Sequence, residues 1–391
     1  MSTFVYNTKL KLFSDFTYFL DDPVNGDQFE QFDYRTVEGA KLQHQWTTQV
    51  LGYGIENEIG IQARNDNIHN GLFHTRDQAE LSVTREDTIE EASSGPFAQT
   101  RIRWNSWLRT VVGLRADYYH FNVDSDLAAN SGFRDRAIAE PKVSFLLGPW
   151  NSSEVYLNFG EGFHSNDARG TTTTIDPRTG QVVLPVTPLV RAKSADVGFR
   201  TSLIPGLQTS VTFFRLDLAS ELVFDGDAGD TEASRPSRRT GIELQNYYSP
   251  RPWLAFDADA SWSKARFTDV QTIGPYIPGA IGTAAAVGAT VPDFHRFFGS
   301  VRWRYFGPRP LIEDDSVRSS ATSLIYLDAG YAISKDTRVT FEIFNLFNSL
   351  ASDIDYYYAS RLPGEPADGV NDLHFHPSEP RSFRAVVAYR F

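Results

Sequence analysis

The chain ends in RSFRAVVAYRF, a segment in which apolar and polar side chains alternate. One face of this segment, read as an extended strand, carries Phe383, Ala385, Val387, Tyr389 and Phe391. The opposite face is mainly polar. A period of two predicts a β-strand with one apolar and one polar side. In water the apolar side would face a core, whereas in a membrane barrel it faces lipid.

The same alternation recurs in other parts of the chain. It is found in FVYNTKLKLFSDFTYFL at 4–20, WLAFDADASWS at 253–263, FFGSVRWRYF at 297–306 and VTFEIFN at 339–345. In the first of these, Phe4, Tyr6 and Leu10 oppose Lys9 and Lys11. We expect each apolar face to point outward, into lipid, and each polar face to point into the barrel.

Composition excludes several classes of function. The chain has 391 residues and no cysteine, which rules out disulfides, thiol catalysis and cysteine-ligated metals. A formal net charge of −12 argues against a nucleic-acid partner. We find no catalytic set and no cofactor motif, and we expect neither an enzyme nor a bound cofactor.

A membrane location is compatible with this sequence although no long apolar run is present. A transmembrane helix needs about 20 apolar residues, but a spanning strand needs only about 9–11 alternating ones. Phe, Trp and Tyr make up 14% of the chain, and such residues exposed to water would promote aggregation. We therefore predict an all-β fold, a transmembrane antiparallel β-barrel of about sixteen strands. Residues 1–391 are expected to form a single domain, and the strand number within 49–96 is left open.

Connections between the alternating segments are of two kinds. Tight turns are expected at 148–153, 204–206, 249–252, 291–293 and 334–336. Long polar loops are expected at 164–187, 224–237, 307–319 and 348–379. Short turns at one end and long loops at the other are typical of outer-membrane barrels.

Several segments together resemble the C-terminal barrel of TonB-dependent outer-membrane receptors. They are VYLNFGEGFHSNDARG at 155–170, the stretch 193–229, RPSRRTGIELQNYY at 235–248, RYFGPRPL at 304–311, FEIFNLFNS at 341–349, YYYASRLPGEP at 356–366 and the terminal strand. The resemblance implies the outer membrane of a Gram-negative bacterium and uptake of a ferric siderophore or similar metal chelate. It also implies that Phe383, Tyr389 and Phe391 form the signal read by the outer-membrane assembly machinery, and that the last strand pairs with the first.

The sequence departs from the family in its N-terminal part. The plug domain, the TonB box and the signal peptide have no counterpart, and family barrels have twenty-two strands. We therefore expect an N-terminally truncated barrel that would reach TonB only through the missing region. Lipid and lipopolysaccharide are the other expected partners, and a monomer is expected. The alternatives are a passive pore without a plug and a non-functional receptor fragment.

Two loop segments contain candidate ligand contacts. His164, Asn166, Asp167 and Arg169 gather where a strand enters a long loop. A Ser/His/Asp triad is not expected there, because neighbours on an extended chain point to opposite faces. The alternative is that these residues only anchor the loop.

The second loop segment contains His374 and His376, which share one face if the segment is extended. A metal needs a third ligand, which the sequence does not place, so the metal is unknown. The alternative is a pair of surface histidines.

Charged residues on the polar strand faces are expected to line the lumen. They are Arg101, Arg103, Arg302, Arg304, Asp257 and Asp259. On the lipid face an arginine would cost roughly 2–4 kcal/mol at the middle of the membrane. The arginines could guide an anionic chelate, or they could form ion pairs across the inner wall with Asp257 or Asp259.

Overall fold

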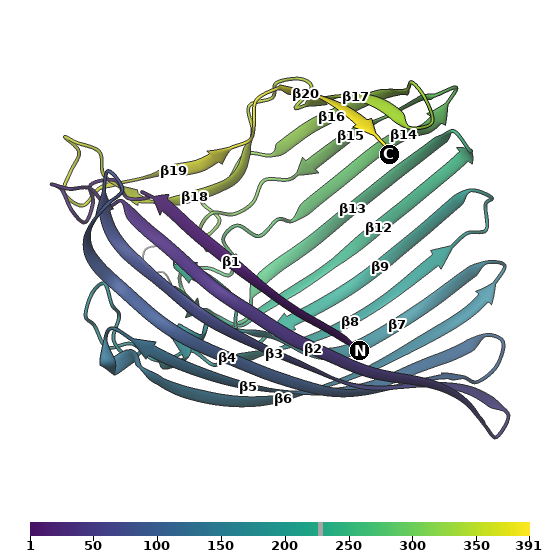
Figure 1. Cartoon of the computed structure of the whole chain (residues 1–391), viewed down its shortest axis with the longest axis horizontal. Helices are drawn as coiled ribbons and strands as arrows, with labels where there is room; N and C mark the ends of the chain where they lie inside the picture. Colours follow the sequence, from purple (N-terminus) through teal and green to yellow (C-terminus); the bar gives the residue numbers. More distant parts are fainter. Residues whose placement is uncertain (226–229) are drawn as a thin grey trace.

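The computed structural model describes residues 1–225 and 230–391, which are mostly β-strand (Figure 1). Sixteen strands form one antiparallel sheet and follow one another in chain order. They are β1 (Ser2–Ser14), β2 (Phe29–Val50), β3 (Tyr53–Arg76), β4 (Ala79–Arg103), β5 (Leu108–Ser125), β6 (Gly132–Trp150), β7 (Ser153–Ser165), β8 (Leu189–Thr201), β9 (Leu207–Leu218), β12 (Ser237–Arg251), β13 (Leu254–Phe267), β14 (Thr283–Phe294), β15 (Phe297–Phe306), β16 (Thr322–Ala332), β17 (Thr337–Phe344) and β20 (Ser382–Tyr389). The predicted fold class and strand number are confirmed.

The remaining elements are short. Two small hairpins stand apart from the main sheet: β10 (Leu222–Asp225) with β11 (Asp230–Ala233), and β18 (Ser352–Ser360) with β19 (Val370–Pro377). A 3-10 turn, η1 (Ala128–Asn130), and one short helix, α1 (Ala168–Thr172), complete the described elements. No helix in the described part of the chain is long and apolar enough to cross a membrane.

The two ends of the sheet differ in their connections, as predicted, but the turns expected at 249–252 and 291–293 are displaced to 252–253 and 295–296, because β12 and β14 continue further than expected. At the end that we call the turn end, the strands are joined by 51–52, 104–107, 151–152, 202–206, 252–253, 295–296 and 333–336. At the opposite loop end, the connections are 15–28, 77–78, 126–131, 166–188, 219–236, 268–282, 307–321 and 345–381. Residues 226–229, within the expected loop 224–237, lie outside the described residues. The expected loop 348–379 is largely the hairpin β18–β19.

Backbone conformation explains why two-residue turns suffice. Asn151 and Ser152 both have positive φ angles, 48° and 60°, and so do Asp77 and Gln78, at 50° and 65°. Two successive positive φ angles are the geometry of a turn whose twist matches that of the flanking strands. The turn at 77–78 is the one short connection at the loop end, and it makes β3 and β4 one long hairpin.

The strands differ in length round the sheet, and two sets of neighbours mark the extremes. β2 to β6, which we call the long wall, have 18 to 25 residues each. β13 to β17 and β20, which we call the short wall, have 8 to 14. Because about 9–11 residues span a membrane, the long wall continues well beyond it at the loop end.

The alternating faces are placed as predicted in every quoted segment except the first. Asp257 and Asp259 of β13 line a cavity on the inner face, whereas Phe256 and Trp262 are exposed on the outer face. On β17, Phe341 stacks on Phe383 of β20 at a ring distance of 5.9 Å, again on the outer face. Apolar residues outside and charged residues inside are what a lipid-facing barrel requires.

Strand β1 is reversed relative to the prediction. Tyr6 pairs with the fully buried Val37, and Leu10 pairs with Asp33, so the apolar residues of β1 share the inner face of β2. Lys9 instead lies over the ring of Tyr34, at 5.8 Å, on the outer face. The reason is register, because opposite residues of an antiparallel pair point to the same side and β2 decides which side that is.

The same segment ends its strand at Ser14, earlier than its alternation suggests. The carboxylate of Asp27 accepts hydrogen bonds from the hydroxyl of Thr17 at 2.8 Å and from the backbone N–H of Leu20 at 2.8 Å. The backbone N–H of Asp22 also donates to Asp27, at 2.7 Å. These bonds fold residues 15–28 into a compact loop that competes with the strand.

The expected pairing of the last strand with the first is wrong for the described residues. β20 pairs with β17 and β1 pairs with β2, but β1 and β20 do not pair with each other. The curvature of the sixteen strands leaves these edges apart, and Figure 1 shows β20 well separated from β1. The hairpin β18–β19 reaches the first loop instead. There, the N–H of Phe19 donates to the carbonyl of Arg361, and the N–H of Arg361 donates to that of Thr17, each at 3.0 Å.

Candidate functional site

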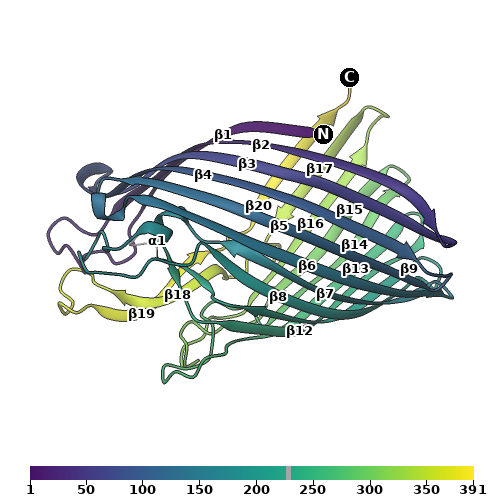
Figure 2. The same cartoon turned by 90° about the horizontal axis from the view of Figure 1, so that it is seen from below.

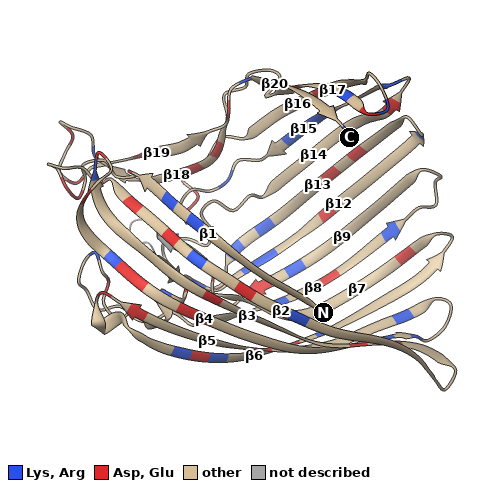
Figure 3. Cartoon of the chain, viewed as in Figure 1, with Lys and Arg blue, Asp and Glu red and all other residues tan. Residues whose placement is uncertain are grey.

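Charged residues recur along the strands of the long wall (Figure 3). Four consecutive strands each carry an arginine and an aspartate two residues apart, which places both on one strand face. The pairs are Asp33/Arg35 on β2, Arg64/Asp66 on β3, Arg85/Asp87 on β4 and Arg115/Asp117 on β5. We call these four pairs the ion-pair belt. Each pair is joined by a hydrogen bond within its own strand, so the belt is largely self-neutralised.

The pair Arg85/Asp87 is fully buried, with both side chains 0% exposed. It lies near the loop end, where the connection 166–188 folds into the curve of the sheet (Figure 2). Helix α1 in this connection contacts β4, β5 and β6. Ala168 and Leu189 join an apolar cluster formed by Ile68, Ile89, Phe121, Val123 and Ile138 of the long wall. We call this the loop-end core.

The predicted loop contacts Asn166, Asp167 and Arg169 lie inside this arrangement. Asp167 caps α1 by accepting from the N–H of Arg169 at 2.9 Å, and the Arg169 guanidinium donates to the same carboxylate at 2.7 Å. Burial alone would raise the pKa of Asp167, but the charge and hydrogen bonds of Arg169 lower it. Asn166 is 2% exposed and donates to the carbonyl of Thr187. These three residues organise the loop, and their contact with a ligand stays a prediction.

His164 lies at the end of β7, next to this loop. Its Nε2 atom is buried and has no hydrogen-bond partner among the described residues. The sequence placed it with Asn166, Asp167 and Arg169, but among the described residues its imidazole forms no hydrogen bond with them. Its role as a ligand contact also stays a prediction.

The histidines of the second predicted set lie on one face of β19, as their spacing suggests. The ring of His374 stacks on Tyr358 with centroids 4.0 Å apart and an interplanar angle of 6°. Nδ1 of His376 lies 3.7 Å from Asp353, and its side chain is 74% exposed. In the described part of the chain, no three His, Asp or Glu residues come together as a metal site.

The predicted lumen residues divide between two walls. Arg302 of β15 donates to Asp257 of β13 at 2.9 Å, which is the ion pair that the sequence left as one alternative. Asp259 lines the same cavity as Asp257. Arg304 is exposed and forms no ion pair with a described residue. Their contact with a passing ligand stays a prediction.

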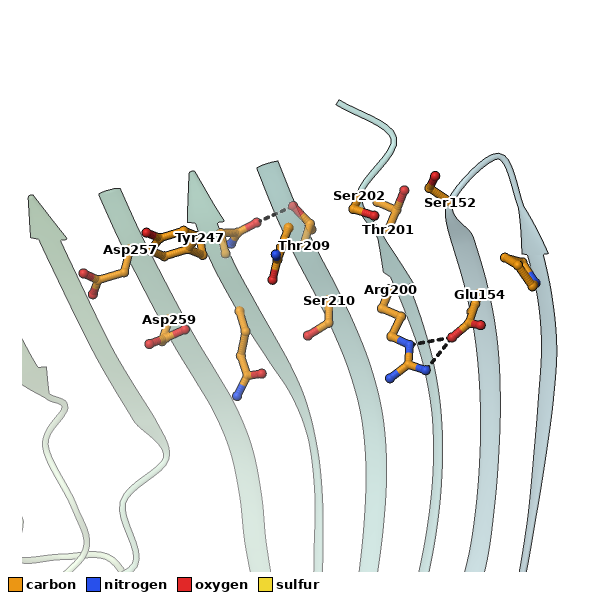
Figure 4. Close-up of a pocket in the computed structure, with 14 residues that line it drawn as sticks. Ser152, Glu154, Arg200, Thr201, Ser202, Thr209, Ser210, Tyr247, Asp257 and Asp259 are labelled. Atoms are coloured by element: carbon orange, nitrogen blue, oxygen red, sulfur yellow. Dashed lines mark hydrogen bonds and ion pairs between the residues drawn. The ribbon is translucent and has the colours of Figure 1, made fainter. Parts of the chain in front are cut away.

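The cavity that contains these aspartates lies near the turn end and has a volume of about 750 Å³. Figure 4 shows Glu154 of β7 and Arg200 of β8 pointing toward each other across its lining, with Asp257 and Asp259 further round the wall. The side chain of Arg200 donates to Glu154 at 2.8 Å. Neither Glu154 nor Arg200 was singled out from the sequence.

A second cavity of about 1040 Å³ lies beside the first and shares Arg200 with it. Arg101, Arg103, Arg109 and Lys142 also line it. Arg101 donates to Glu56 at 2.9 Å, whereas Arg103 has no ion pair with any residue that the structure describes. Sequence reasoning found Arg101 and Arg103 but missed Arg109 and Lys142, which lie on neighbouring strands in no common motif.

The ion-pair belt was also missed, although a signal was present. An arginine and an aspartate two residues apart in a strand share a face and can pair without any tertiary information. The spacing recurs on four successive strands, which distinguishes it from chance. The buried pair Arg85/Asp87 was not recognised because the sequence left the strands within 49–96 undefined.

The terminal residues Phe383, Tyr389 and Phe391 are exposed on the outer side of the edge strand β20 and beyond its end. The ring of Tyr389 lies 5.1 Å from that of Phe391 in an edge-to-face arrangement. Their exposure is compatible with contact by a partner or by lipid. Recognition by the assembly machinery stays a prediction.

An antiparallel sheet with an apolar outer face, a charged inner face, tight turns at one end and structured loops at the other defines an outer-membrane barrel. The family described as "TonB dependent receptor-like, beta-barrel" matches residues 2–346, and the chain belongs to this family. Family membership places it in the outer membrane of a Gram-negative bacterium. No match was found among curated proteins.

Solved structures of such receptors share the fold. The ferric yersiniabactin uptake receptor FyuA from Yersinia pestis is 11% identical, with a TM-score of 0.70, and the match covers 93% of this chain and 55% of that one. The ferric preacinetobactin receptor BauA from Acinetobacter baumannii is 13% identical, with a TM-score of 0.73 and coverages of 98% and 59%. The copper transporter OprC is 15% identical, with a TM-score of 0.71 and coverages of 100% and 62%. The chain thus spans 55–62% of the length of these three proteins.

Proposed function

We propose that the chain is the barrel portion of a receptor that takes up a ferric siderophore or similar metal chelate, energised through TonB in the complete protein. It would bind its ligand and let it pass without covalent chemistry, as a single barrel domain and a monomer surrounded by lipid and lipopolysaccharide. The family and the names of the structural relatives support this function. The main structural support is the loop end, where structured loops lie over a charged inner wall.

The candidate contacts fall into two groups by accessibility. His376 is the most exposed and could meet a ligand arriving from outside. His374 presents a ring already stacked on Tyr358, to which a flat aromatic ligand could add. Asn166, Asp167 and Arg169 form part of the inward-folded loop, and a ligand would reach them only if that loop opened. His164 is half-buried beside the loop, at the end of β7.

Uptake of radiolabelled ferric chelates tests this function. The complete receptor that contains this barrel would be expressed in cells without their own siderophore receptors, with TonB present or deleted. We expect uptake of one class of chelate, lost without TonB. His376→Ala should lower the apparent affinity several-fold. The matched change His295→Ala, at the turn end, should leave uptake unchanged. Absence of uptake for every chelate, with the receptor detected at the cell surface, would contradict the proposal.

A passive pore is the second candidate, and the two large cavities on the charged inner wall favour it. A pore would conduct ions when the purified chain is inserted into a planar bilayer, and solute flux in cells would not depend on TonB. Stable channel openings together with TonB-independent flux would support the pore over the receptor. Absence of conductance, with folded protein present in the bilayer, would exclude the pore.

A further inference from the structure

An excess of positive charge lies on the inner wall at the turn end of a chain that is acidic overall. Arg101, Arg103, Arg109, Arg200 and Lys142 line one cavity of about 1040 Å³, and Glu56 is the only acidic side chain in its lining. Glu154, next to it, accepts from both Arg109 and Arg200. The four arginines of this lining therefore face Glu56 and the adjoining Glu154, while Lys142 also borders Glu58, Glu140 and Glu161 in a neighbouring cavity.

The arrangement of Arg103 and Arg109 is unusual for a sheet. They are directly opposite each other in the pairing of β4 with β5, on the same inner face. Like charges in this position destabilise a strand pair, because their Cβ atoms are only about 4.5–5.5 Å apart. Glu154 is shared between Arg109 and Arg200, and Arg103 has no ion pair with a described residue. Glu154 thus offsets part of the repulsion on the Arg109 side, and the charge of Arg103 is not compensated by a described residue.

Other arginines on the same wall, those of the ion-pair belt, have carboxylate partners. Arg64, Arg85 and Arg115 each have an aspartate two residues further along the strand. For Arg103, the residues at this spacing are Arg101 and Asn105, neither of which is acidic. Arg103, at the turn end, therefore lacks the aspartate that accompanies the arginines of the ion-pair belt.

Space for an anion is present beside Arg103. Gly54 is its partner on β3, and a Cβ built on Gly54 would meet no atom within 4 Å. Nε of Arg109 is buried and has no hydrogen-bond partner among the described residues. Guanidinium groups bind carboxylates and phosphates through paired N–H donors, and two facing guanidinium groups suit an anion with more than one charge.

We propose that Arg103 and Arg109, assisted by Arg101, Arg200 and Lys142, form a binding site for a multivalent oxyanion, either a phosphate or a polycarboxylate. The site lies at the turn end, away from the loops that would capture an imported chelate. It does not depend on the proposed uptake, because it can be tested on the barrel alone.

Isothermal titration calorimetry of the folded chain in a non-ionic detergent tests the proposal. Inorganic phosphate and citrate are the two probes, and chloride at matched ionic strength is the reference. We expect saturable binding of at least one probe and none of chloride. Preference for phosphate or for citrate decides between the two sources of the oxyanion. Equal heats from all three anions would overturn the proposal.

Three variants distinguish a specific anion-binding site from a general electrostatic effect of the inner wall. Arg103→Gln should weaken binding at least tenfold without loss of folding, because it removes an unpaired charge. Gly54→Asp keeps every cation but puts a carboxylate opposite Arg103, and it should weaken binding by a similar factor. Arg304→Gln, a change at another unpaired inner arginine, should bind as the parent does. Unchanged binding in the first two variants, or an equal loss in the third, would show that no such site exists.

Discussion

The long wall and the short wall differ in how their loop ends are stabilised. The strands of the long wall continue past the membrane at the loop end and carry the loop-end core, in which Phe121 is 0% exposed. The short wall stops earlier, and its corresponding cluster contains only Ala265, Phe267 and Ile277, with Ala280 against it. Outside the membrane the long wall is therefore built like a soluble protein, whereas the short wall depends on its loops.

The largest expected effect is the loss of an aromatic ring from the loop-end core. Phe121→Ala should lower the free energy of unfolding by about 3–5 kcal/mol, because a cavity remains in a rigid cluster. Phe267→Ala in the smaller cluster should cost less, because the surrounding loops can collapse into the gap. Urea unfolding in lipid vesicles, followed by tryptophan fluorescence, measures both. Equal costs would show that the two walls are packed alike.

The next effect concerns the contact that joins the ends of the two walls. Arg361→Pro removes the N–H that donates to the carbonyl of Thr17, and an unpaired buried group costs about 1–3 kcal/mol. We expect the β18–β19 hairpin to leave the first loop and to become sensitive to protease. Arg361→Ala keeps the N–H and serves as the control. Protection of the hairpin in the proline variant would argue against this contact.

Sequence alternation predicted much of the fold but not all of it. It identified the faces of β13, β15, β17 and β20, because charged residues such as Asp257 and Arg302 can only face water. It failed for β1, because alternation defines two faces without deciding which is inner. The pairing of Leu10 with Asp33 decides that, and pairing is a property of two strands.

The site was less predictable than the fold for a related reason. Arg101 and Arg103 can be found in one strand, but Arg109, Lys142 and Arg200 join them only through the order and register of the sheet. The pairing of the last strand with the first was also mispredicted. The terminal strand has the expected sequence, yet edge pairing depends on the curvature of the whole sheet.

A smaller effect is expected at the cap of α1, which attaches the inward-folded loop to the long wall. Asp167→Asn can keep the capping hydrogen bond but loses its charge interaction with Arg169, at a cost of about 1–2 kcal/mol. Because the pKa of Asp167 is lowered in the folded state, its contribution is present above the unfolded value of about 3.9. The contribution is lost as the pH falls through the lowered folded value.

Hydrogen exchange of the amides of 168–172 measures this opening. The parent should open more readily as the pH falls below about 4, and the difference between parent and Asp167→Asn should shrink in the same range. The variant Asp176→Asn, in the same loop but outside the helix, is the control. A difference between parent and Asp167→Asn that does not change with pH would assign the effect to packing and not to charge.

The smallest effect is expected when an exposed ion pair of the short wall is broken, and a buried pair of the long wall provides the comparison. The short-wall pair Arg302/Asp257 is 44% and 22% exposed, so Arg302→Gln should cost less than about 1 kcal/mol. The long-wall pair Arg85/Asp87 is 0% exposed on both sides, and breaking such a pair by removal of one partner costs about 3–5 kcal/mol. High salt should reduce the first cost and leave the second unchanged, because solvent ions screen only charges that they reach. Equal costs in urea unfolding would mean that the lumen of the short wall excludes water as fully as the loop-end core does.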